Sequence, residues 1–213
     1  MVVRNLDFEK QIASFISEYS YFQKKTLNDV SYLKGILDIP SDEGTVAGSF
    51  LVEIHPSKGF PYAFPILYEV GGEIPCEADW HKYSDNSCCL TVPAEEKLMC
   101  KNGITLGWFV QNAAIPYFAN QLHKKRTGRY LQEYSHGSAG IKEFYDKIFH
   151  SSDINIWREC MKSAFENSKY ERNALCYCNS GKKYKKCHLP VENDIRVIGK
   201  EYIINDLKIL GLI

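Results

Sequence analysis

The chain has 213 residues, of which 45% are hydrophobic and 24% charged, the composition of an ordinary globular protein rather than a disordered or fibrous one. Lys and Arg number 26, as do Asp and Glu, so no net charge directs the chain toward nucleic acid or a membrane surface. The sequence has no apolar run of the ~18 residues needed to span a membrane, and its first residues do not form a signal peptide, so we expect a cytoplasmic protein with reduced cysteines.

The first part of the chain predicts one helix followed by antiparallel strands. Apolar residues recur at helical spacing within 7–23, with Asp7 as the expected N-cap. Residues 32–39, 45–54 and 66–70 are rich in β-branched and aromatic side chains and predict three strands, the first two joined by a hairpin turn. A helix followed by an antiparallel meander is an α+β arrangement.

Beyond residue 90 the pattern is mainly helical. Residues 93–97 are expected to form a loop beside the thiols at 88 and 89, and the apolar stripe over 106–122 predicts a helix that Pro116 kinks or interrupts. The basic residues of 123–129 predict a solvated helix end. Two further amphipathic helices are predicted at 141–149 and 154–165, a polar boundary at 167–173, and a helical tail at 194–213.

A polar, turn-rich loop begins at His81 and ends in Cys88 and Cys89, where apolar sequence resumes. A thiol in this position is fixed by its neighbours and open to a large partner, and Cys is the most nucleophilic common side chain near neutral pH. A lone Cys is more often a small apolar residue in a core. The sequence around the two cysteines is therefore needed to distinguish an accessible nucleophile from a buried core residue.

Those residues resemble the active-site signature of ubiquitin-conjugating enzymes, which reads His-Pro-Asn, a polar loop with Gly, and then Ile-Cys-Leu. With the signature Cys placed on Cys89, the spacing of eight residues back to the signature Asn is kept, and the Asn falls on His81. The remaining matches are Gly on Asn86, Ile on Cys88 and Leu on Leu90.

Upstream, residues 60–65 are similar to the family's Tyr-Pro-x-x-Pro-Pro segment, which leads into its third strand. The resemblance covers roughly residues 5–150. The chain lacks the family's His-Pro-Asn and Trp-Ser-Pro segments, and in this it is like the bacterial branch found in antiphage and ubiquitin-like operons.

The resemblance implies a ubiquitin-conjugating fold and an enzyme of that transferase type. Cys89 would accept an acyl group as a thioester from an activating enzyme and pass it to an amine. His81 would act as oxyanion donor, acid or base, Asp85 would orient it or raise the basicity of the amine, and Cys88 either fills the buried Ile position or competes as the nucleophile. The implied cargo is the C-terminus of a cGAS-like nucleotide synthase, as in cyclic-oligonucleotide (CBASS) antiphage systems, or of a ubiquitin-like protein.

The most specific motif lies near the end of the chain. Cys176, Cys178, Cys187 and His188 supply three thiols and one imidazole, the donor set of a tetrahedral Zn²⁺ site. Their spacing, with Ser-Gly and Tyr between them, is similar to the SEC-C motif, a zinc-binding module that recruits other proteins. Because all four ligands come from the chain, we expect one structural zinc ion rather than a catalytic one.

These patterns predict a catalytic domain at 1–150, a helical linker at 151–170, the zinc motif at 171–190 and a helical tail at 191–213. The basic residues around the motif favour docking to an acidic protein over binding to nucleic acid, and no membrane partner is expected. The main alternative function is an inactive adaptor that uses both domains for protein docking. A redox protein with a vicinal Cys88–Cys89 pair is disfavoured, because adjacent cysteines form strained disulfides.

Overall fold

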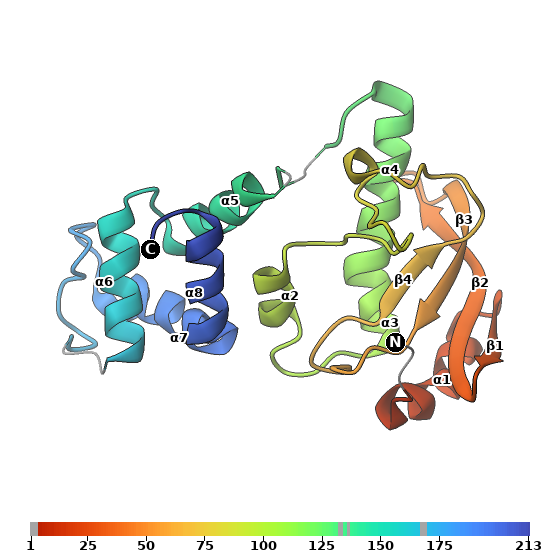
Figure 1. The fold of residues 1–213 in the computed structure, drawn as a ribbon, viewed down its shortest axis with the longest axis horizontal. Coiled ribbons are helices and arrows are strands. Elements are labelled where there is room, and N and C mark those ends of the chain that lie inside the picture. The colour runs from red at the N-terminus through yellow and green to blue at the C-terminus, as the bar shows by residue number, and fades with distance from the viewer. Residues whose placement is uncertain (1–3, 132–133, 136, 167–169) are drawn as a thin grey trace. The chain divides into compact units, whose positions relative to one another are not determined.

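The computed structural model describes residues 4–131, 134–135, 137–166 and 170–213 of the chain. It is the mixed α+β structure that the sequence predicts, and it forms two compact units (Figure 1). The first unit comprises Met1–Thr91 and Cys100–Glu133, and the second comprises Val92–Met99 and Tyr134–Ile213.

The first unit is built on one antiparallel sheet in the order β1-β2-β3-β4. Strands β2 (Val30–Pro40), β3 (Val46–His55) and β4 (Ile66–Glu69) confirm the three predicted strands. The segment over 60–65 therefore leads into the fourth strand of this sheet. Along β2 and β3 buried and less buried residues alternate, so one face of the sheet is packed and the other is more open.

One strand of the sheet, β1 (Phe22–Leu27), was not predicted. The helix before it, which we expected to reach residue 23, ends at Glu18. Only Phe22 of β1 is buried, so the strand lacks the apolar alternation that marks a half-buried strand. Asn28 and Asp29, both with positive φ, form the two-residue turn that pairs β1 with β2, which is the geometry of a type I′ hairpin.

Helix α1 (Leu6–Glu18) begins two residues earlier than a cap at Asp7 would place it, and it is capped by Asn5 instead. The Asn5 side chain accepts a hydrogen bond from the Phe8 amide at 2.9 Å, and Asp7 instead lies in the first turn. The buried face of α1 consists of Phe8, Ile12 and Phe15. Its aromatic rings pack in the core, where Phe15 meets Phe22 edge to face.

The predicted helix over 106–122 is present, but its interruption takes a specific form. Helix α3 (Leu106–Phe109) passes through a π-helical turn, η2 (Val110–Ala114), into α4 (Ile115–Thr127). Pro116 lies in the first turn of α4, directly after the widened turn, so the chain stays helical where a regular α-helix would clash with the proline ring. Phe118 of α4 stacks on Phe50 of the sheet, which confirms the core-facing stripe.

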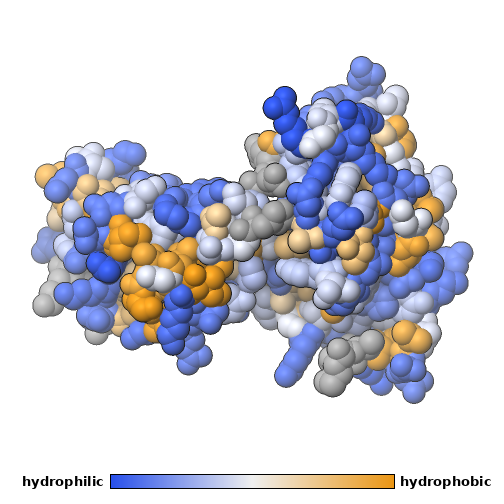
Figure 2. All heavy atoms as spheres, turned by 45° about the horizontal axis from the view of Figure 1, so that its top comes forward, coloured by the Kyte–Doolittle hydropathy of each residue, from blue (hydrophilic) through white to orange (hydrophobic). Residues whose placement is uncertain are grey.

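The second unit is helical and has its own core. It contains α2 (Pro93–Met99), α5 (Ser138–Phe149), α6 (Ile154–Phe165), α7 (His188–Ile198) and α8 (Lys200–Ile209). Trp157 is fully buried and stacks on Phe149, while Cys160 is packed in the same cluster. Figure 2 shows hydrophobic residues gathered on the visible face of this unit, with hydrophilic residues around them.

Several expectations about this region differ from the structure. Residues 93–97 form helix α2, which packs against α7, rather than a loop. Helix α5 belongs to the second unit rather than to a domain ending at 150, because its aromatic residues pack with Trp157. The polar stretch 167–173 lies partly outside the described residues, and the second unit extends across it.

The tail contains two helices instead of one. Helix α7 starts at His188 and α8 ends at Ile209, and Gly199, with φ of 94°, separates them. This positive φ suits glycine and ends α7. Among the described residues, no helix combines the length and the apolar character needed to cross a bilayer.

Candidate active site and metal centre

The thiol loop, residues 78–90, is closed by backbone hydrogen bonds. The Cys89 amide donates to the His81 carbonyl at 2.8 Å, and the neighbouring residues Lys82 and Cys88 form an antiparallel bridge. The Cys88 amide donates to the Leu67 carbonyl at 2.8 Å, which attaches the loop to β4. The eight-residue spacing from His81 to Cys89 therefore places the two backbones opposite each other.

The tip of the loop is a tight turn shaped by its own side chains. One carboxylate oxygen of Asp85 accepts from the Ser87 amide at 3.0 Å and from the Ser87 hydroxyl at 2.6 Å. The Ser87 hydrogen bonds hold the pKa of Asp85 below its ordinary value. Asn86 has a φ of 69°, a left-handed conformation that Gly and Asn adopt most readily, and it occupies the position where the conjugating-enzyme signature has Gly.

The two cysteines differ in exposure. Cys88 is 7% exposed, and burial raises the pKa of its thiol to about 11 although the Tyr117 hydroxyl beside it acts in the opposite direction. Cys89 is half-buried, so its side chain is more accessible to a partner. Of the two thiols, Cys88 therefore has the environment of a packed core residue.

Helix α4 holds the approach to the loop with one row of polar side chains at positions i, i+4 and i+7. The Tyr117 hydroxyl lies 3.3 Å from the Trp80 carbonyl and 3.2 Å from that of His81. The Gln121 side chain donates to the Trp80 carbonyl at 3.1 Å. Lys124 donates to the Asp79 carbonyl and to the Asp79 carboxylate, the latter at 2.7 Å.

These contacts correct the expectation of a solvated helix end at Lys124, whereas Lys125, Arg126 and Arg129 are exposed as predicted. Lys124 is buried, and its ammonium also lies over the rings of Trp80 and Tyr130. The Tyr130 ring packs edge to face against the half-buried His81 at 5.0 Å. The His81 side chain is thus placed by aromatic packing and its backbone by α4.

A buried ion pair fixes the other side of the loop. Lys82 lies 3.5 Å from the Glu69 carboxylate, with side chains 1% and 0% exposed, and its ammonium also donates to the Glu69 carbonyl at 3.3 Å. Glu69 in turn accepts from the amides of Glu73 and Ile74. The Lys82–Glu69 ion pair therefore joins the thiol loop to the end of β4, and Glu69 also binds the turn that follows β4.

The metal centre assembles the four residues that the sequence predicts. The ligand atoms of Cys176, Cys178, Cys187 and His188 all lie within 4.8 Å of one another. His188 Nδ1 is 3.3 Å from both the Cys176 and Cys187 sulfurs, so it is the ring nitrogen that faces the thiols. Burial lowers the pKa of His188, which favours the neutral imidazole that binds metals. Three thiols and one imidazole at these separations fit a metal ion.

Behind the ligands lies a buried polar cluster that sequence analysis did not identify. Glu192 of α7 is fully buried and accepts hydrogen bonds from the hydroxyls of Tyr177 and Tyr184. The Tyr177 ring packs against His188 at 4.9 Å. This cluster links α7 to the ligand-bearing loop and orients the imidazole. The signal was present as tyrosines interleaved with the ligands, but their partner Glu192 lies just beyond the motif, on the helix that follows it.

The residues around the thiol loop were also missed. Gln121 is a polar position within the apolar helical stripe, which is a usable signal. Lys124 belongs to the basic run that follows, and nothing local marks Lys82 and Glu69 as partners. The four residues predicted from the sequence lie together in one loop: His81, Asp85, Cys88 and Cys89. Asp85 bonds to Ser87, so its carboxylate shapes the turn.

A comparison with protein families finds the SEC-C motif at residues 172–190. It confirms the motif predicted from the spacing of the four ligands, over a small part of the chain. Neither a curated protein nor a solved structure matches the chain. The resemblance of the first unit to ubiquitin-conjugating enzymes therefore stays a prediction.

Proposed function

We propose that this protein is an acyl carrier of the ubiquitin-conjugating type, in which Cys89 holds the C-terminus of another protein as a thioester and transfers it to an amine. The observation that supports this most is the contrast within the vicinal pair. Cys88 is packed away while Cys89 is half-buried on a loop fixed from two sides. A nucleophile that meets a large partner needs this combination of access and rigidity.

The chemistry is two successive acyl transfers. In the first, the Cys89 thiolate forms a bond to the acyl carbon as the thiolate of an activating enzyme leaves. In the second, an amine attacks the same carbon, the bond to Cys89 breaks, and the amine proton passes to a base. Both steps pass through a tetrahedral oxyanion, and one well-placed donor there contributes about 3 kcal/mol.

We assign His81 either to stabilise this oxyanion or to accept the proton of the amine. Its backbone pairs with that of Cys89, and its half-buried ring is packed on Tyr130. The ring can donate to the oxyanion or take the amine proton. Asp85 contributes by shaping the turn through Ser87, which sets the direction of the last residues before Cys89.

The metal centre is proposed to bind one structural Zn²⁺. Three thiolates and an imidazole form a closed tetrahedral set, which leaves no open position for a substrate. The surrounding sequence is rich in exposed lysines, so an ion is needed to hold the loop. We infer that the zinc-bound loop serves as a docking module for a protein partner.

The partners follow from the resemblance. They are an activating enzyme and, as cargo, either a cGAS-like nucleotide synthase or a ubiquitin-like protein, in cytoplasmic antiphage defence. The test is to incubate the protein with an activating enzyme, ATP and each cargo, and to look for an adduct that thiols cleave. We expect the adduct with Cys88→Ala, and none with Cys89→Ala. An adduct that persists on Cys89→Ala refutes the assignment.

The second candidate is an adaptor that binds partners without catalysis. The SEC-C motif favours it, because this part of the chain is matched by a family model and needs no catalytic thiol. In that case Cys89→Ala leaves all partner binding unchanged and no adduct forms on the wild-type chain. A pull-down with the same cargo, run beside the adduct assay, separates the two candidates.

A further inference from the structure

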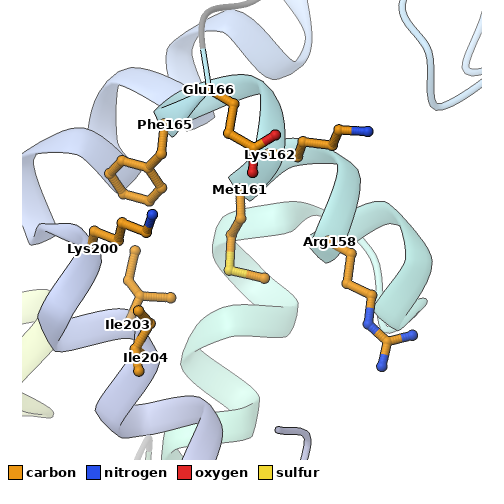
Figure 3. A pocket seen from close by; sticks show the side chains of 8 residues that line it. All are labelled: Arg158, Met161, Lys162, Phe165, Glu166, Lys200, Ile203 and Ile204. Atoms are coloured by element: carbon orange, nitrogen blue, oxygen red, sulfur yellow. The ribbon is translucent and has the colours of Figure 1, made fainter.

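Helices α6 and α8 of the second unit border an apolar groove that neither the thiol loop nor the metal centre uses. Its volume is about 230 Å³. The floor and walls are apolar, and the rim is charged (Figure 3). The apolar side chains are Met161, Phe165, Ile203 and Ile204, and the charged ones are Arg158, Lys162, Glu166 and Lys200.

The positions along the helices explain this division. Met161 and Phe165 are four residues apart on α6 and share one side of it, and Arg158 and Lys162 are four apart on an adjacent strip. Ile203 is buried, whereas Met161, Phe165 and Ile204 are only half-buried. The groove thus leaves the side chains of Met161, Phe165 and Ile204 partly in contact with solvent between two helices.

The rim favours an anionic partner. Three exposed cations, Arg158, Lys162 and Lys200, and one exposed carboxylate, Glu166, line the groove. In the described part of the chain, Arg158, Lys162 and Lys200 have no carboxylate partner. An incoming acidic group therefore has no internal ion pair to displace.

The size of the groove selects among anionic partners. Pockets that enclose small ligands usually measure about 300–1,000 Å³ and cover most of the ligand surface. A smaller, solvent-open groove between two helices fits a few side chains of a polypeptide instead, as when an amphipathic helix docks in a hydrophobic groove. We propose that the α6–α8 groove binds an acidic amphipathic helix of a partner protein, with its apolar side chains on Met161 and Phe165 and its carboxylates on the basic rim.

The test uses the full-length chain and a fluorescent helical peptide of roughly 16 residues, about four turns. The peptide has Leu on one face and Glu on both flanks, and a matched peptide has Lys in place of each Glu. Binding is followed by fluorescence anisotropy at two salt concentrations. We expect the Glu peptide to bind about tenfold more tightly than the Lys peptide, with the difference shrinking at high salt.

Variants then locate the binding. The double variant Arg158→Glu, Lys162→Glu changes only exposed side chains. It should weaken binding of the Glu peptide about tenfold, because each attraction becomes a repulsion. Lys24→Glu, an exposed position of β1 that does not line the groove, is the matched control for a single charge reversal and should change binding by less than about twofold. Met161→Asn should weaken the binding of both peptides, because it removes apolar contact in the groove.

Three results overturn the proposal. The first is equal binding of the Glu and Lys peptides, and the second is binding that the groove variants leave unchanged. The third is competition from another occupant: displacement of the peptide by a stoichiometric fatty acid, or a dimer in sedimentation that the Arg158→Glu and Lys162→Glu pair dissociates. None of these results bears on thioester formation at Cys89, so this inference and the proposed function fail independently.

Discussion

Replacing Lys82 with Met should loosen the thiol loop more than any exposed charge substitution in the first unit. Lys82 and Glu69 lie 3.5 Å apart with side chains 1% and 0% exposed. At an effective dielectric constant of about 20, charges at that separation attract by about 5 kcal/mol before desolvation is counted. Removing one partner leaves a buried carboxylate unpaired, so we expect Lys82→Met to lower the free energy of loop opening by about 3–5 kcal/mol.

The assay reads the loop directly. Cys88 is buried and bridges to Lys82, so its thiol reacts with an alkylating reagent only after the loop opens. Alkylation against urea concentration, read by peptide mass spectrometry, gives the opening free energy of this loop separately from unfolding of the second unit. The control is Lys125→Met, which breaks the exposed Lys125–Glu73 pair and should cost less than about 1 kcal/mol.

A double replacement completes the test. Lys82→Met with Glu69→Leu removes both buried charges, so the combined variant should recover most of the stability that Lys82→Met loses. The reasoning is refuted if Lys82→Met costs no more than Lys125→Met, or if the two substitutions at the buried pair simply add.

Three further outcomes are expected. Tyr117→Phe removes the hydroxyl that reaches the backbone carbonyls of residues 80 and 81, and should speed Cys88 alkylation by a free-energy change of about 1 kcal/mol, whereas an unchanged rate would contradict that contact. The pKa of Asp85 is lowered in the folded loop, so its contribution to loop stability is present above the unfolded pKa and is lost as pH falls through the folded pKa. Protection of the Cys88 thiol from alkylation should therefore weaken as the wild-type protein is acidified. Asp85→Ala should flatten that pH dependence. A strong chelator should remove one zinc ion per chain by elemental analysis and lower the melting temperature of the second unit, and Cys187→Ser should make the melting insensitive to chelator.

The features that could be predicted from the sequence are those whose chemistry is local. The four metal ligands lie within thirteen residues, and their spacing alone placed them together, as the structure and the SEC-C match confirm. Strands β2, β3 and β4 were found because their segments are rich in β-branched and aromatic residues, which pack well in a sheet. Strand β1 was missed because a single buried aromatic residue holds an otherwise exposed edge strand.

In the thiol loop, the burial of each cysteine could not be predicted from the neighbouring sequence. The spacing from His81 to Cys89 placed both residues in one loop, but it did not show which of the two cysteines is buried. That difference depends on Leu67 and Tyr117, which lie on β4 and α4 and reach the loop only in the folded chain. The same holds for Lys124, whose place in a basic run indicated solvent until the structure paired it with Asp79.

By itself, then, the sequence determined the metal-binding motif, the α+β character and the existence of a polar loop ending in two thiols. Those features depend on residue type and short spacing, which are independent of the rest of the fold. Only the tertiary structure decided the partner of Lys82, the row of side chains that α4 presents to the loop, and the assignment of helices α2 and α5 to the second unit. Each of these depends on which distant segments share a buried space, and burial between segments is set by packing rather than by the pattern within any one of them.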